Sequence, residues 1–126
     1  MAEKTIVVIE DEQEAAEMFA EMMRVSGFRV LKATSSAPGM QLIASERPDA
    51  VVLDIMMPDI SGLDVLRFMR EDPQLAKIPV IVVSAKSMPA DIKMGLEAGA
   101  SVYLTKPVGY LDLKDAVEKV LGLGDA

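Results

Sequence analysis

The sequence predicts a doubly wound α/β domain, a five-stranded parallel sheet in the order 2-1-3-4-5 with helices on both faces. Runs of consecutive apolar and β-branched residues, typical of strands buried on both faces, occur at residues 5–9, 50–53 and 80–83. Segments with helical spacing separate these runs, and parallel strands joined by helices need right-handed crossovers. The order 2-1-3-4-5 is the economical one for such a chain.

Length and composition limit the class of protein. The 126 residues suit one domain, which would bury roughly two-thirds of its unfolded surface. The absence of cysteine excludes disulfides and thiolate metal sites, and the absence of histidine removes zinc-type sites. A net charge of −7 argues against direct binding to nucleic acid or to an anionic membrane. The first apolar run is too short for a signal peptide or a membrane span, so we expect a soluble cytoplasmic protein.

The first expected strand, residues 5–9, ends in the acidic pair Glu10 and Asp11. Apolar residues at helical spacing follow, at Ala15, Met18, Phe19, Met22 and Met23. Gly27 is expected to end this helix at its C-terminal cap. A short strand at residues 29–33 comes next.

The second expected helix begins at Ser35, a residue suited to an N-cap. This start places Pro38 in the first turn, where its missing N–H costs little. Pro48 ends the helix.

The third strand is a buried run that ends abruptly on the carboxylate of Asp54. Pro58 and Gly62 mark the turn that follows. The next helix closes before Pro73, and its apolar stripe is expected at Leu63, Leu66 and either Met69 or Arg70. A carboxylate at the carboxyl end of a buried strand lies where open α/β sheets place their ligands.

The fourth strand, residues 79–84, ends on the hydroxyl of Ser84. A helix over residues 89–98 follows and stops at Gly99. Gly95 lies inside this helix and should cost it about 1 kcal/mol relative to alanine.

The fifth strand, residues 101–105, ends at Lys106. The last helix carries apolar residues at helical spacing, at Leu113, Val117, Val120 and Leu121.

In the predicted order, the carboxyl ends of four strands meet at one edge of the sheet. The first and third strands bring Glu10, Asp11 and Asp54 there. The fourth and fifth strands bring Ser84 and Lys106. Neighbouring carboxylates raise one another's pKa, so this cluster calls for a counter-ion. Because only oxygen ligands are on offer, Mg²⁺ is favoured; calcium is disfavoured because no EF-hand loop is present.

A magnesium ion beside a carboxylate and a lysine can neutralise a transferring phosphoryl group. An aspartate can be the nucleophile that accepts this group as an acyl phosphate. The cluster therefore predicts phosphoryl chemistry at Asp54.

The motifs together resemble the receiver domain of two-component response regulators, which has a flavodoxin-like (βα)5 fold. The residues that carry the resemblance are Glu10-Asp11, 54–58 with Gly62, Ser84-Ala85 and 103–107. They occur in the right order and at the right spacing over about residues 5–121. The resemblance implies a single receiver domain over residues 1–126, either stand-alone or cut from a larger regulator.

The resemblance implies a phosphoacceptor switch that catalyses only its own phosphorylation and dephosphorylation. Asp54 would accept the phosphoryl group from the phosphohistidine of a histidine kinase or phosphotransfer protein. Asp11, Asp54 and the backbone carbonyl of Met56 would ligate Mg²⁺ directly, and Glu10 would act through a water molecule.

The same resemblance implies roles for three residues on the last two strands. Lys106, followed by a cis bond to Pro107, would pair with Asp54 and later with the phosphoryl oxygens. Ser84 would move to hydrogen-bond the phosphoryl group, and Tyr103 would change its burial in concert.

The fourth expected helix is apolar on more than one side, so a second stripe must face solvent or a partner. Met88, Ile92 and Leu96 have the spacing to form that stripe. The resemblance places Ile92, Tyr103 and Val108 on an output face. After phosphorylation this face would bind a downstream effector protein or a second copy of the chain.

Two other classes of protein share some of these features. Aspartyl-phosphate hydrolases of the haloacid dehalogenase type place a second aspartate two residues after the nucleophile, where this chain has Met56. A flavin-binding module needs a phosphate-cradling loop after the first strand, where this chain has acidic residues that would repel phosphate. The hydrolase stays the alternative to the receiver.

Overall fold

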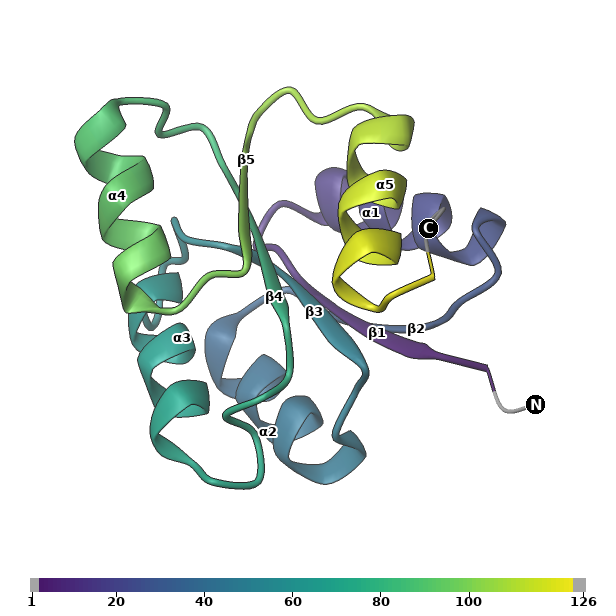
Figure 1. Cartoon of the computed structure of the whole chain (residues 1–126), viewed down its shortest axis with the longest axis horizontal. Coiled ribbons are helices and arrows are strands. Elements are labelled where there is room, and N and C mark those ends of the chain that lie inside the picture. Colours follow the sequence, from purple (N-terminus) through teal and green to yellow (C-terminus); the bar gives the residue numbers. More distant parts are fainter. Residues whose placement is uncertain (1–2, 124–126) are drawn as a thin grey trace.

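A computed structural model describes residues 3–123, in which five strands alternate with five helices (Figure 1). The strands are β1 (Thr5–Ile9), β2 (Arg29–Ala33), β3 (Ala50–Asp54), β4 (Val80–Ser84) and β5 (Val102–Thr105). The helices are α1 (Gln13–Val25), α2 (Ser36–Glu46), α3 (Gly62–Glu71), α4 (Pro89–Ala98) and α5 (Tyr110–Val120). Among the described residues, no helix has the length and apolarity needed to cross a bilayer.

The strands form one parallel sheet in the predicted order β2-β1-β3-β4-β5. Ile9 lies opposite Leu53, so Glu10 leaves the sheet beside the end of β3. Ser84 lies opposite Thr105, so Lys106 leaves it beside the end of β4. The register therefore brings these strand ends to one edge.

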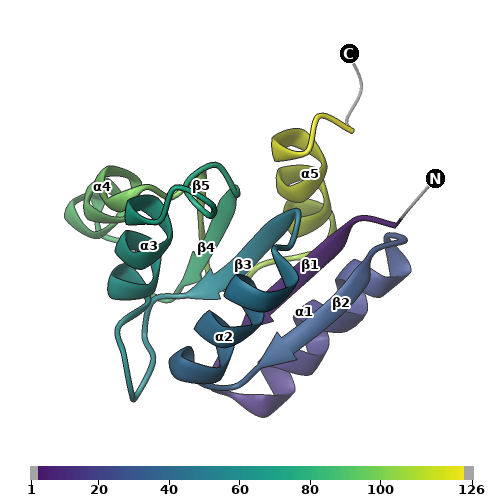
Figure 2. The same cartoon turned by 90° about the horizontal axis from the view of Figure 1, so that it is seen from below.

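The side chains of the sheet alternate between two hydrophobic clusters, one on each face. The cluster under α1 and α5 contains Ile6 and Val8, and the cluster under α2 and α3 contains Val7 and Ile9. Figure 2 shows the two layers of helices on opposite sides of the sheet, with α4 beside α3 and β5. The central strands are thus covered on both faces, as their continuous apolar runs predicted.

Local signals for the ends of the helices are confirmed in part. Gly27 and Gly99 follow α1 and α4 with φ of 98° and 119°, a left-handed conformation that glycine adopts without steric cost. Ser35 is the N-cap residue of α2, as predicted, but its side chain makes no capping hydrogen bond. The carboxylate of Asp59 takes that role.

Candidate functional site

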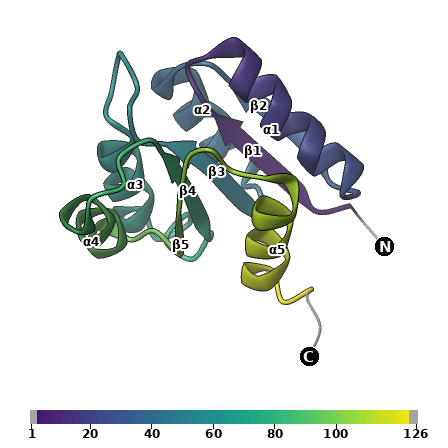
Figure 3. The ribbon, with the colours of Figure 1, turned by 90° about the horizontal axis from the view of Figure 1, so that it is seen from above.

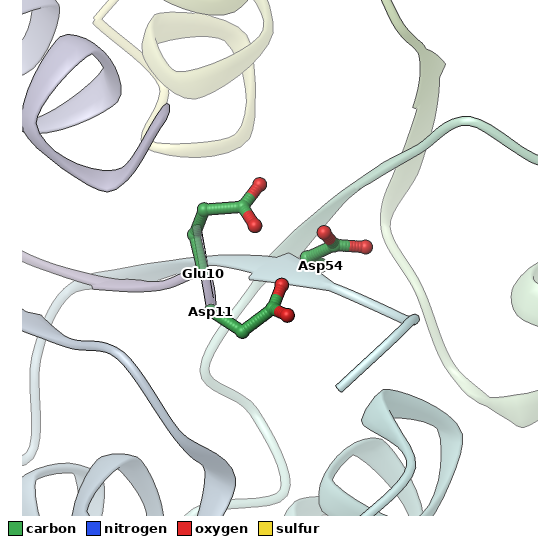
Figure 4. Close-up of side chains that lie close together, drawn as sticks. All are labelled: Glu10, Asp11 and Asp54. Carbon is green, nitrogen blue, oxygen red and sulfur yellow. The ribbon is translucent and has the colours of Figure 1, made fainter. Parts of the chain in front are cut away.

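Three carboxylates gather where β1 and β3 end (Figure 4). Glu10 and Asp11 directly follow β1, and Asp54 is the last residue of β3. One carboxylate oxygen of each residue lies within 4.8 Å of the other two. Glu10 and Asp54 are buried and Asp11 is exposed, so the group opens to solvent on the side of Asp11.

Lys106 reaches this group from the end of β5. Its ammonium donates to Oε1 of Glu10 at 2.7 Å and to Oδ2 of Asp54 at 3.0 Å. Its backbone N–H donates to the carbonyl of Ser84 at 2.8 Å, which continues the pairing of β4 and β5 by one residue. The Lys106–Pro107 bond is cis, as the resemblance implied.

Burial and hydrogen bonding change the pKa of two groups in the site. Burial raises the pKa of Glu10 to about 7, although the hydrogen bond from Lys106 opposes this effect. Burial alone would lower the pKa of Lys106, but the hydrogen bonds to Glu10 and Asp54 outweigh it and raise that pKa. Lys106 is therefore a permanent cation at neutral pH.

The donor set fits a hard divalent cation. Every side-chain ligand atom in the group is a carboxylate oxygen, and Lys106 already pairs with two of the three carboxylates. Among residues 3–123, Asp11 makes no ion pair, so the group keeps excess negative charge on its open side. A cation that takes oxygen ligands and retains several waters matches this arrangement.

The backbone after Asp54 orients the carboxylate. The N–H of Met56 donates to Oδ1 of Asp54 at 2.9 Å, while Oδ2 faces Lys106. At Gly62, the first residue of α3, a Cβ atom would lie 2.5 Å from both the carbonyl oxygen of Asp54 and the Cα of Ile55. Gly62 therefore allows α3 to begin directly against the end of β3. The sequence predicted a glycine only as part of the turn, whereas this close approach explains why a larger residue would not fit.

Ser84 and Tyr103 lie on neighbouring strands and meet the same residue. The hydroxyl of Ser84, fully buried, accepts the N–H of Lys86 at 3.1 Å. The hydroxyl of Tyr103 donates to the carbonyl of Lys86 at 2.7 Å. Within the described residues, no hydrogen bond joins the Ser84 hydroxyl to Asp54 or Lys106. Ser84 thus borders the acidic group without joining its hydrogen bonds.

Of the three residues expected on an output face, Ile92 and Tyr103 are half-buried and Val108 is buried. In the predicted second stripe, Met88 and Leu96 are 66% and 46% exposed. Val108 is a correction: its side chain is only 7% exposed and packs in the core cluster under α1 and α5. The apolar side chain of Val108 is buried where the chain passes from β5 toward α5, so it offers no surface to a partner.

Comparisons with known proteins identify the family of this chain and agree with its fold. A family described as "Response regulator receiver domain" matches residues 6–118. The chain is 28% identical over 119 residues to the polar-differentiation response regulator DivK of Brucella anthropi, and equally to that of Brucella ovis. These alignments cover 94% of this chain and 97% of each relative.

Solved structures give the same result. The receiver domain of Francisella response regulator 1452 has a TM-score of 0.88 at 27% identity, covering 94% of this chain and 97% of that one. A response regulator receiver domain protein from Clostridium thermocellum has a TM-score of 0.87 at 28% identity, covering 94% of each chain.

Proposed function

Because this chain belongs to the response regulator receiver domain family of two-component signalling, we propose that Asp54 is its phosphoryl acceptor. Receiver domains are phosphoacceptor switches that interact with a histidine kinase or phosphotransfer protein and with an effector. The observation that carries the proposal is the buried carboxylate of Asp54, which is paired with Lys106 inside a group of three carboxylates.

Receiver domains bind Mg²⁺ at an acidic pocket, and the carboxylates of this chain fit that ion. We assign Asp11, Asp54 and the backbone carbonyl of Met56 as its direct ligands, with Glu10 acting through water. When bound, the ion supplies positive charge that neutralises the oxygens of the transferring phosphoryl group.

In the transfer step, a carboxylate oxygen of Asp54 attacks the phosphorus of a phosphohistidine. The new O–P bond forms as the P–N bond breaks, and the imidazole, protonated on its other nitrogen, leaves with the electron pair as a neutral ring. Lys106 stays protonated and can follow the negative charge from Asp54 to the phosphoryl oxygens. Among residues 3–123, the Ser84 hydroxyl accepts one hydrogen bond and donates none, so its proton can be donated to the same group.

The hydrolase alternative makes a different prediction about the lifetime of the acyl phosphate. Met56, two residues after Asp54, cannot move a proton, and its side chain is about half exposed. Lys86, two residues after Ser84, is cationic and is a poor general base at neutral pH. We therefore expect the acyl phosphate to persist for minutes or longer.

The test uses a small-molecule phosphodonor with Mg²⁺, removal of the donor, and measurement of the phosphate that remains on the protein. A parallel reaction with a chelator in place of Mg²⁺ should give no phosphorylation. Loss of the phosphate within a second of donor removal would favour the hydrolase.

We also propose that the signal is transmitted through the face formed by α4, β5 and α5, which rearrange when a phosphoryl group is attached beside Lys106 and Ser84. The supporting feature is the apolar surface on α4, where Ile92 lies in a shallow groove with Pro89 and Leu96. Tyr103 ties β5 to the loop that follows Ser84. The partner is a downstream effector or a second copy of the chain.

A further inference from the structure

The loop between β3 and α3, residues 55–61, carries Met56 and is hydrogen-bonded to the start of α2. The carboxylate of Asp59 accepts the N–H of Ser36 on Oδ1 and the N–H of Ala37 on Oδ2, both at 3.0 Å. These donors belong to the first two residues of α2, whose N–H groups have no partner inside the helix. Figure 3 shows the loop extending beside the start of α2.

A third hydrogen bond fastens the loop to the same helix. The hydroxyl of Ser36 donates to the carbonyl of Ile60 at 2.6 Å, and the Ser36 side chain is fully buried. Two consecutive loop residues are thus bound to two consecutive residues of α2. The N–H groups of Ser36 and Ala37 lower the pKa of Asp59 to about 2, so its carboxylate stays ionised at neutral pH.

The other end of the loop is anchored at the acceptor itself. Met56 donates its N–H to Asp54, and the N–H groups of Met57 and Gly62 donate to the carbonyl of Ile55 at 3.1 and 2.8 Å. Met57 and Ile60 also pack against the core, whereas Met56 lies exposed between the two anchors. The position of the Met56 backbone therefore depends on both ends of the loop.

We propose that Asp59 is a positioning residue for the magnesium site, because it clamps the loop that carries Met56 to the start of α2. This inference rests on the proposed assignment of the Met56 carbonyl as a ligand. Removing a residue that orients a metal ligand typically lowers metal affinity by roughly 10- to 100-fold. Since the core contacts of Met57 and Ile60 remain, we expect the lower end of that range for Asp59→Ala, about tenfold weaker Mg²⁺ binding.

The experiment measures Mg²⁺ affinity by calorimetric titration of the whole chain, with urea unfolding to establish that each variant is folded. Asp59→Asn keeps one acceptor oxygen for the helix and removes the charge, so it should bind Mg²⁺ more tightly than Asp59→Ala. The control is Asp49→Ala. Asp49 also accepts a backbone N–H, from Thr5 at 2.7 Å, but lies at the opposite edge of the sheet. Its removal should leave Mg²⁺ affinity unchanged.

The outcomes separate the possible causes. Unchanged affinity in Asp59→Ala would overturn the inference. Equal weakening in Asp59→Ala and Asp59→Asn would also overturn it, because the loss would then come from the missing charge. If Asp59→Ala does not fold, Ser36→Ala removes the bond to Ile60 from the other side and should weaken Mg²⁺ binding; unchanged affinity there would again refute the clamp. A wild-type protein that binds no Mg²⁺ would instead refute the proposed metal site.

Discussion

Replacing Gly95 by alanine should have opposite effects on stability depending on whether Tyr103 is present. Gly95 is buried in α4, and a Cβ atom there would lie 2.7 and 2.8 Å from Cδ2 and Cε2 of the Tyr103 ring. These distances are well inside van der Waals contact. The ring must move, or α4 must shift away from β5, before alanine can fit.

Two terms of known size compete at this position. Alanine favours the helix over glycine by about 1 kcal/mol. Overpacking a well-filled site costs roughly 1–3 kcal/mol. The substitution should therefore lower the free energy of unfolding by about 0–2 kcal/mol in the wild type. In a Tyr103→Ala background the ring is gone, so the same change should raise stability by up to about 1 kcal/mol.

Urea unfolding of the two single variants and the double variant measures the coupling energy, which we expect to be about 1–3 kcal/mol. Tyr110→Ala is the matched control because this tyrosine lies at the start of α5 and a Cβ on Gly95 would not meet it. Gly95→Ala should act in that background as it does in the wild type. An effect of the same sign and size with and without Tyr103 would show that the ring does not lie over Gly95.

Three further predictions concern other parts of the molecule. The guanidinium of Arg70 donates hydrogen bonds to the carbonyl groups of Gly99, Ala76 and Ile78. Because lysine lacks these planar donors, Arg70→Lys should lower the free energy of unfolding in urea by about 2 kcal/mol. A change below about 0.5 kcal/mol, typical of an ordinary surface site, would contradict this prediction. Ile92→Glu should take up phosphate normally but lose association in sedimentation or partner pull-down, and equal association would place the output face elsewhere. Asp59 has a pKa lowered from 3.8 to about 2, so its contribution to stability is present above pH 3.8 and is lost as the pH falls through 2; the difference in urea midpoint between wild type and Asp59→Asn should shrink over that range, and a constant difference would refute the assignment.

Most of the fold could be predicted because strong local signals agreed with the rules of parallel sheets. The strands at residues 5–9 and 29–33 and the helix at 89–98 have the predicted bounds, and the last strand begins one residue later than expected, at Val102. Parallel strands all end at the same edge of the sheet, and the predicted order 2-1-3-4-5 then sets which strand ends are neighbours. Asp54 and Lys106 were found for the same reason, because each marks the end of a strand that the sheet brings to a common edge.

The remaining features depend on partners that are distant in the sequence. Ser35 has the residue type of an N-cap, yet the oxygens that cap α2 belong to Asp59, 23 residues beyond Ser36. The helical pattern could not choose between Met69 and Arg70; Met69 is buried and Arg70 binds carbonyls of other segments.

Two other side chains show the same limit. From the sequence, Gly95 is predicted only to destabilise its helix. The ring of Tyr103, which leaves no room for a larger residue at position 95, lies on another element, β5. Val108 was placed on the output face by resemblance, and only the packing under α5 shows it to be buried.

The central claim is that Asp54 accepts the phosphoryl group, and intact-mass measurement after reaction with a small-molecule phosphodonor and Mg²⁺ tests it most directly. The wild type should gain one phosphoryl group, and Asp49→Asn, an aspartate at the far edge of the sheet, should do the same. Asp54→Asn should gain none while remaining folded. Stoichiometric phosphorylation of Asp54→Asn at another residue would contradict the account.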